Sequence, residues 1–299
     1  MTPAAPQSGI PKSTRPITGL AEIAGNYDAF LLDLWGVLHD GVGAHAGALG
    51  AARALKAAGK LIGILSNGPR RAAAVAERTA ELGITPDLYD VIHSSGEETW
   101  QALAGRSGDW VAGLGRRCLP IVPPKDRSLL QGLDLELTDD PARTDFVLLS
   151  GTDRPEETVA DYEAQLQTIL RHGLSMICAN PDLEVVRGSA REICAGAIAA
   201  RYESLGGRVR YFGKPHPEVY RRCLQALGSP HPSRVLAVGD SLRTDIAGAA
   251  RAGIDSLFVA GGIHRAELTQ GGVFDAALFA RLCERQGVIP SYLADEFHW

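Results

Sequence analysis

The sequence predicts an α/β protein with an open, doubly wound parallel sheet and a second α/β domain inserted into it. Three observations predict this class. Short apolar segments alternate with helical segments over residues 30–104 and again over residues 208–262. Glycine or polar residues end most of the apolar segments, as is typical of buried parallel strands. The stretch between the two blocks, residues 105–207, changes to shorter strand candidates separated by turns that contain Pro and Asp.

Length and composition narrow the function classes. The 299 residues are 45% hydrophobic, which is enough for about two domains. The formal charge of −5 gives no general attraction to nucleic acid or to an anionic membrane, so neither is expected as a partner. The five cysteines are scattered and lack a CxxC spacing, which predicts reduced and mostly buried thiols. The sequence shows no apolar leader and no spanning segment, so we expect a cytoplasmic protein.

The first block of the core is predicted from its alternating segments. Residues 1–16 are rich in Pro, Ser and Thr and are expected to form a flexible tail, and the core domain begins at residue 17. Its order of strand and helix implies parallel strands joined by right-handed crossovers. The expected elements are a short helix over 17–26, a strand from 30, helices over 46–58 and 70–82, strands over 61–65 and 91–93, and a helix ending near 104.

The inserted domain and the second block of the core follow. We predict an inserted α/β domain over residues 105–207, with the core resuming over residues 208–299. In the inserted domain we expect strands over 119–122, 133–137, 146–149 and 175–179 and helices over 156–171 and 193–205. In the resumed core we expect strands over 209–212, 234–238 and 254–259, helices over 217–227 and 246–252, and a last segment from 276 that is helical and then extended.

Polar groups stand directly after strand-like segments at four places in the predicted core. They are Asp33, Ser66, Lys214 and the pair Asp240 and Asp245. Ligands of open α/β sheets bind at the carboxyl ends of the strands, so these groups are candidates for one site. Carboxylate oxygens suit Mg²⁺, a Ser hydroxyl with neighbouring backbone N–H groups can hold phosphate oxygens, and a Lys ammonium offsets negative charge. Each part alone is explained equally well by a turn or a helix cap, and the ordered combination favours phosphate chemistry.

With these motifs the sequence resembles the haloacid dehalogenase (HAD) superfamily of phosphatases, in particular its class IIA members. The residues that carry the resemblance are Asp33-Leu-Trp35-Gly36-Val37, Leu65-Ser66-Asn67, Gly213-Lys214-Pro215, Gly239-Asp240 through Asp245, and, in the inserted domain, Asn180-Pro181-Asp182 before a helix rich in Gly and Ala. The resemblance implies a Rossmann-like core with a class IIA cap. It also implies Mg²⁺-dependent hydrolysis of a small phosphate ester of the sugar or nucleotide class, and allows a homodimer through the cap.

The resemblance also implies a role for each matching residue. Asp33 would be the nucleophile, which forms an aspartyl-phosphate and also binds Mg²⁺ together with the backbone carbonyl of Trp35 and with Asp240. Asp245 would orient the metal shell directly or through water. Ser66, with the neighbouring Asn67 and Gly68, and Lys214 would bind the phosphoryl group. Asn180 and Asp182 are candidates for substrate contact, although an Asn-Pro-Asp turn can also form for local reasons.

Trp35 is where the sequence departs from the family pattern. The family's first motif is usually Asp-x-Asp, and its second Asp protonates the leaving group, which an indole cannot do. General acid–base help is typically worth ~10²–10⁴-fold, so its loss predicts slow hydrolysis. Three accounts stay open. His39, or Asp40 beside it, supplies the proton; the substrate is an acyl phosphate or an activated phosphonate that needs no acid; or the protein binds a phosphorylated ligand without turnover.

Overall fold

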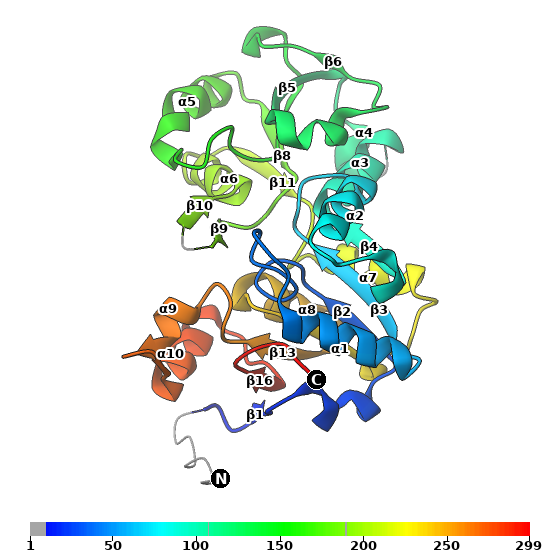
Figure 1. The fold of residues 1–299 in the computed structure, drawn as a ribbon. Coiled ribbons are helices and arrows are strands. Elements are labelled where there is room, and N and C mark those ends of the chain that lie inside the picture. Colours follow the sequence, from blue (N-terminus) through cyan, green and yellow to red (C-terminus); the bar gives the residue numbers. More distant parts are fainter. Residues whose placement is uncertain (1–9, 107, 189) are drawn as a thin grey trace. The chain divides into compact units, whose positions relative to one another are not determined.

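The computed structural model describes residues 10–106, 108–188 and 190–299. The chain divides into two compact units (Figure 1). Unit 1 comprises the described residues up to Ile64, Asp87–Val91 and Leu224–Trp299, and unit 2 comprises Leu65–Pro86 and the described part of Ile92–Cys223.

Unit 1 is built on the larger sheet, whose strands follow the order β1-β16-β13-β12-β2-β3-β4. After the edge strand β1, the chain passes to the middle of the sheet at β2, adds β3 and β4 on one side, and later adds β12, β13 and β16 on the other side. Strand order therefore reverses between β2 and β12, which makes the sheet doubly wound, as predicted. The strands and helices that lie wholly or partly in this unit are β1 (Arg15–Pro16), the 3-10 helices η1 (Leu20–Glu22) and η2 (Ala24–Asn26), β2 (Ala29–Leu32), α1 (Ala46–Ala57), β3 (Leu61–Ser66), the 3-10 helix η3 (Pro86–Leu88), β4 (Val91–Ser94), α7 (Pro217–Ala226), the 3-10 helix η7 (Pro232–Arg234), β12 (Val235–Gly239), the π-helix η8 (Leu242–Ile246), α8 (Ala247–Ala252), β13 (Asp255–Val259), α9 (Arg265–Leu268), β14 (Thr269–Gln270), β15 (Val273–Phe274), α10 (Ala276–Gln286) and β16 (Tyr292–Ala294).

Buried apolar side chains hold the helices of unit 1 to this sheet. Phe258 of β13 stacks on Phe279 of α10 with ring centroids 5.5 Å apart, and Leu293 of β16 belongs to the same cluster. On α1 the buried residues recur at helical spacing, from Ala48 to Leu55, so that one face of the helix is apolar. The core of unit 1 therefore fixes the strand ends from which the candidate site residues project.

Unit 2 carries a five-stranded sheet with helices on both faces. Its order is β11-β8-β7-β5-β6, and all of its pairings are parallel. Alternate side chains of β7 point to opposite faces of the sheet. Val147 packs in a cluster with residues of α5 and α6, and Leu148 packs in a cluster with residues of α3 and α4. The further elements of this unit are α2 (Ala72–Glu81), α3 (Ser95–Ala104), α4 (Asp109–Ala112), β5 (Arg117–Ile121), β6 (Glu136–Leu137), β7 (Phe146–Leu149), α5 (Glu163–Arg171), β8 (Ser175–Cys178), β9 (Glu184–Arg187), β10 (Ala190–Ile193), α6 (Ala195–Ser204) and β11 (Arg208–Tyr211).

The structure corrects the predicted organisation in three places. Residues 1–9 of the predicted tail lie outside the described residues, but Arg15 and Pro16 of that tail pair with β16 as strand β1. Strand β11, which the sequence analysis assigned to the resumed core, pairs with β8 in the sheet of unit 2, so this sheet extends beyond residue 207. The antiparallel pair β9 and β10 was not predicted. Their sequences, Glu-Val-Val-Arg and Ala-Arg-Glu-Ile, do not alternate apolar and polar residues, so they lack the pattern that predicts a strand.

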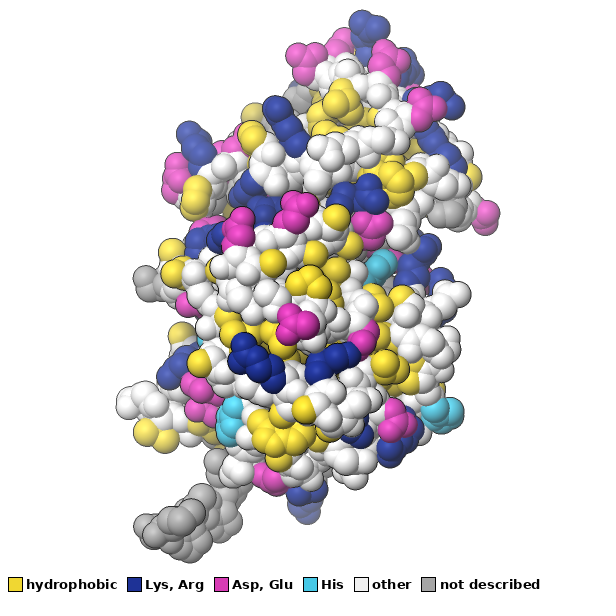
Figure 2. Space-filling view, turned by 45° about the vertical axis from the view of Figure 1, so that its right-hand side comes forward, with side chains coloured by type: hydrophobic (Ala, Val, Ile, Leu, Met, Phe, Trp, Pro, Cys, Tyr) yellow, Lys and Arg dark blue, Asp and Glu magenta, His cyan; other side chains and the backbone are white. Residues whose placement is uncertain are grey.

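The distribution of charged side chains on the surface agrees with the small net charge of the sequence. Acidic and basic side chains of the described residues are intermingled on the face shown in Figure 2. All five cysteines, which lie in the described part of the chain, are buried thiols outside any disulfide, as predicted. Burial raises the pKa of the Cys283 thiol to about 11, which keeps it protonated. Within the described ranges, no helix is both long and apolar enough to cross a membrane.

Candidate functional site

Three aspartates of unit 1 form a buried carboxylate cluster. Each of Asp33, Asp240 and Asp245 offers an oxygen, and these oxygens all lie within 4.8 Å of one another. Asp33 follows β2 and Asp240 follows β12, the two strands between which the strand order reverses. Such a switch point is where ligands of doubly wound sheets bind. The sheet register therefore brings together the three carboxylates that the sequence singled out.

Backbone amides orient each of the three carboxylates. The N–H of Leu34 donates to Asp33 Oδ1 at 2.8 Å, and the N–H of Ile263 donates to Asp240 Oδ2 at 2.7 Å. Asp245 accepts at Oδ2 from the N–H of Ser241, at 3.1 Å. Because these donors belong to fixed turns of the chain, the carboxylates are held in place before any ligand arrives.

Glycine backbones approach the carboxylate cluster more closely than any side chain could. A Cβ at Gly262 would lie 2.2 Å from the Cβ of Asp240, and one at Gly239 would lie 2.2 Å from the Cβ of Asp245. Gly36 has φ +77° and would place a Cβ 1.8 Å from Asp240 Oδ2. The sequence pattern identifies these glycines only as ends of strands and turns. Their contact with the aspartates depends on the tertiary fold.

Replacing Gly262 by alanine is expected to lower the affinity of unit 1 for a divalent cation by about tenfold or more. The added methyl group must displace Asp240, and displaced supporting groups typically cost ~10–100-fold in metal affinity. Isothermal titration with Mg²⁺ or Mn²⁺ measures the effect. Gly43→Ala is the matched control, since no atom lies within 4 Å of its Cβ. Equal cation affinity in both folded variants would contradict the role given to the Gly262 contact.

The turn after Asp33 buries His39 against Trp35. Their ring centroids are 5.0 Å apart with an interplanar angle of 71°, and His39 is 4% exposed. The N–H of Gly41 donates to His39 Nδ1 at 2.9 Å, so the neutral ring carries its proton on Nε2. Asp40 accepts instead from the N–H groups of Val42 and Gly43, and these bonds lower the pKa of its carboxyl group, beginning with the one from Gly43. Asp40 is therefore ionised at neutral pH and has no proton to donate, whereas His39 can donate one only as the imidazolium, after Nδ1 is protonated and gives up the bond from Gly41.

A second group of predicted residues gathers in unit 2, around Asn67. Asn67 Oδ1 accepts from the N–H of Lys214 at 2.7 Å, and its Nδ2 donates to Lys214 O at 3.1 Å and to Asp182 Oδ1 at 2.9 Å. The N–H of Gly68 donates to Ser66 Oγ at 3.0 Å. Asn180 Oδ1 accepts from the N–H of Asp182 at 3.0 Å, the local turn that the sequence allows. The side chains of Asn67, Asn180 and Asp182 thus all have partners within the protein.

The predicted site residues therefore form two groups, one in each unit. The carboxylates Asp33, Asp240 and Asp245 share unit 1 with Trp35 and His39, and the Ser66 and Lys214 loops share unit 2 with the Asn-Pro-Asp turn. The Ile263 amide and the glycines around Asp240 are site residues that the sequence analysis missed. The Gly261-Gly262 pair at a strand end was the available signal. The metal-binding carbonyl of Trp35 and the substrate contacts remain predictions.

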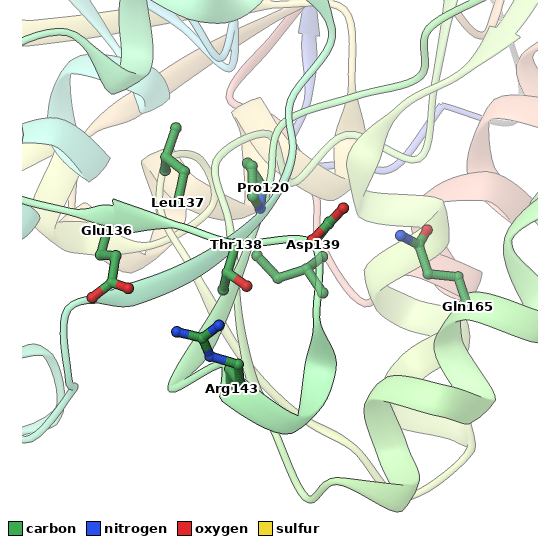
Figure 3. A pocket seen from close by; sticks show the side chains of 8 residues that line it. Pro120, Glu136, Leu137, Thr138, Asp139, Arg143 and Gln165 are labelled. Carbon is green, nitrogen blue, oxygen red and sulfur yellow. The ribbon is translucent and has the colours of Figure 1, made fainter.

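Unit 2 also contains a pocket that none of these predicted residues lines. It has a volume of about 500 Å³, and Figure 3 shows Arg143 and Gln165 among the side chains around it. It is open and mixed in charge, and its lining includes none of the predicted site residues. The residues that line it are Leu119, Pro120, Glu136, Leu137, Thr138, Asp139, Arg143 and Gln165.

Comparison with known proteins identifies the family. A model described as haloacid dehalogenase-like hydrolase matches residues 30–136, and one described as HAD-hydrolase-like matches residues 211–281. A crystal structure of a hydrolase of the haloacid dehalogenase-like family from Brucella suis 1330 is 33% identical, with a TM-score of 0.81. The match covers 94% of this chain and 99% of that one.

Two curated relatives match over shorter stretches. Ribonucleotide monophosphatase NagD of Escherichia coli K12 is 33% identical over 31% of this chain, and dihydroxyacetone phosphatase of Corynebacterium glutamicum is 31% identical over 42% of it. These matches span 36% and 44% of the relatives' own lengths, less than half of each. The full-length match to the Brucella structure and the two family models, which include all five motif residues Asp33, Ser66, Lys214, Asp240 and Asp245, show that this chain belongs to the haloacid dehalogenase-like hydrolase family.

Proposed function

We propose that the protein is a Mg²⁺-dependent phosphohydrolase of small phosphate esters, of the sugar or nucleotide phosphate class. The observation that carries this proposal is the buried cluster of Asp33, Asp240 and Asp245 at the switch point of the sheet. The names of the two curated relatives, one a ribonucleotide monophosphatase and one a dihydroxyacetone phosphatase, support the substrate class.

The chemistry of the cluster suits Mg²⁺. Three carboxylates that are each at most 8% exposed repel one another strongly unless a cation offsets their charge. Their oxygens are hard donors, and the cluster contains no thiolate or imidazole that would favour zinc. When bound, Mg²⁺ would supply positive charge to the phosphoryl oxygens and to the attacking carboxylate.

The proposed reaction has two displacements at phosphorus. A carboxylate oxygen of Asp33 forms a bond to phosphorus as the bond from phosphorus to the ester oxygen breaks, which gives an aspartyl-phosphate and an alkoxide that takes up a proton. Water then attacks the phosphorus of this intermediate and loses a proton, the bond to Asp33 breaks, and inorganic phosphate leaves. The hydrogen bond from the Leu34 backbone N–H to Asp33 Oδ1 orients the carboxylate in both displacements.

Ser66 and Lys214 are proposed to bind the phosphoryl group. The Ser66 hydroxyl and its neighbouring backbone N–H groups would donate to phosphate oxygens, and the Lys214 ammonium would offset their charge. Both side chains are largely buried, at 8% and 2% exposed, which strengthens their electrostatic effect. The role of Asn180 as a substrate contact stays a prediction, as do the homodimer through the cap and the cytoplasmic location.

The source of the leaving-group proton is the least conventional part of the proposal. We favour His39, as its imidazolium, among the two candidates in the turn, because the bonds to Asp40 lower the pKa of that carboxyl group and leave it without a proton to donate. Donation by His39 would require a proton on Nδ1 in place of the hydrogen bond from the Gly41 N–H. A substrate with an activated leaving group remains the alternative, since it needs no donor.

Turnover is expected to depend on Mg²⁺. We expect release of inorganic phosphate from a panel of sugar and nucleotide monophosphates with Mg²⁺, and a loss of about 100-fold or more after chelation, because several kcal/mol of charge stabilisation is removed. The phosphate released from each member of the panel measures this. Asp240→Asn should require more Mg²⁺ for half-maximal rate. Binding of inorganic phosphate without any turnover across the panel would instead support the silent, ligand-binding alternative.

A further inference from the structure

The Asn67 side chain forms hydrogen bonds with both the backbone N–H and the backbone carbonyl of Lys214. Its Oδ1 accepts from Lys214 N–H at 2.7 Å, and its Nδ2 donates to Lys214 O at 3.1 Å. The second hydrogen on Nδ2 points to Asp182 Oδ1, at 2.9 Å. A side-chain amide has two N–H donors, so both are used within the protein. Asn67, which is 2% exposed, therefore has no donor left for a substrate.

The loop that carries Lys214 lies in close contact with the side-chain amide of Asn67. Gly213 has φ +109°, and a Cβ there would lie 2.5 Å from Asn67 Oδ1 and 2.7 Å from the Cβ of Ser95. The hydroxyl of Ser95 lies 2.7 Å from Asn67 O and 2.6 Å from Ala179 O. Because glycine alone fits this approach, the loop can lie close enough to Asn67 for both hydrogen bonds to the Lys214 backbone.

Asp182 is fixed independently at the other end of the contact. Its N–H donates to Asn180 Oδ1, and its carbonyl accepts from the N–H of Gly196 at 3.0 Å, at the start of α6. A Cβ at Gly196 would lie 2.3 Å from Pro181 O, so helix and turn are in close contact. The carboxylate that holds Asn67 thus belongs to a rigid turn, and its charge strengthens the hydrogen bond.

We propose that Asn67 and Asp182 are positioning residues for Lys214 and not substrate contacts. Asp182 orients the Asn67 amide, and this amide in turn fixes the backbone from which the Lys214 side chain reaches the phosphoryl group. The inference rests on the proposed function in one respect, the binding of phosphate by Lys214. It reassigns two residues that the sequence analysis placed among the substrate ligands.

Exchanging the two polar groups tests the proposal. Asn67→Asp keeps the acceptor for Lys214 N–H but faces Asp182 with a like charge and removes both donors. We expect kcat to fall about tenfold or more, with a smaller change in KM, and the Kd for inorganic phosphate to rise by a similar factor. Asp182→Asn alone keeps an acceptor for Asn67 and should change either constant by less than about threefold.

The double variants separate hydrogen bonding from charge. Asn67→Asp with Asp182→Asn restores the charge and also the contact, because the introduced amide can donate to the introduced carboxylate. It should recover kcat and phosphate affinity only in part, because Lys214 O still lacks the donor that Asn67 Nδ2 supplied. Asn67→Asp with Asp182→Ala restores the charge alone and should stay close to Asn67→Asp. Tyr202→Phe is the control for loss of a buried bond in unit 2, the 2.6 Å bond to Leu174 O, and should leave both constants unchanged.

The outcomes distinguish this inference from the function on which it rests. Equal behaviour of the two double variants, in an enzyme that hydrolyses phosphate esters, would overturn the positioning role alone. A native protein that neither binds phosphate nor releases it would overturn the proposed function. Hydrogen exchange is still informative in that case, because Asn67→Ala should speed exchange at the Lys214 amide, and unchanged exchange would contradict the positioning role.

Discussion

Asp33→Asn is expected to lower kcat by at least about 10⁴-fold at saturating Mg²⁺, because an amide oxygen cannot form the acyl phosphate on which turnover depends. The substitution preserves shape and keeps an acceptor for the Leu34 N–H, so the fold should be retained. Steady-state assays on the best substrate of the panel measure the loss, with circular dichroism as the check on folding.

A matched control separates this effect from a general loss of negative charge. Asp28 lies in the same unit, on the surface, and pairs with Arg234. Asp28→Asn should leave kcat within about twofold, because an exposed ion pair is worth little. Retention of more than about 1% of native turnover by folded Asp33→Asn would show that Asp33 is not the nucleophile.

Trp35→Asp is expected to raise the hydrolysis of an alkyl phosphate by about 100-fold or more, because it restores a carboxyl group at the position that lacks a general acid. General acid–base help is typically worth ~10²–10⁴-fold. The same change should have little effect on nitrophenyl phosphate, whose leaving group needs little protonation. Comparing the two substrates in one assay therefore isolates proton transfer from binding.

Two further variants, Trp35→Phe and His39→Ala, decide how the result for Trp35→Asp is interpreted. Trp35→Phe keeps an aromatic ring against His39 and adds no acid, so it should not accelerate the alkyl phosphate. An unchanged rate for Trp35→Asp, together with an inactive His39→Ala, would assign the proton to His39. Acceleration by Trp35→Phe would mean that the indole obstructs the substrate and that the missing acid is not the cause of slow turnover.

The fold was largely predictable because its signals are local. Apolar segments that end in glycine or a polar residue located β2, β3, β12 and β13, and the alanine-rich stretch located α1. Strand β11 was placed in the wrong sheet because its alternating sequence, Arg208–Tyr211, suits an edge strand of either sheet. Only the pairing with β8 decides between them, and that pairing depends on distant residues.

The residue types of the candidate site could be predicted from the sequence, but several of the contacts between these residues could not. Asp33, Asp240 and Asp245 stand out because carboxylates follow buried strands, and the register then places them together. The roles of Asn67 and Gly262 could not be predicted, because Asn67 binds the backbone of Lys214, which is distant in sequence, and Gly262 contacts Asp240 only in the folded chain. A side chain that binds backbone leaves no pattern of its own in a single sequence.

Trapping the covalent intermediate tests the central claim most directly. The Mg²⁺-loaded enzyme is mixed with a radiolabelled phosphate ester, quenched in acid within one turnover, digested and mapped by mass spectrometry. The account predicts one acid-stable, hydroxylamine-labile phosphoryl group on the peptide that contains Asp33, and none in Asp33→Asn. Turnover without a label on Asp33, or with the label on another residue, would contradict it.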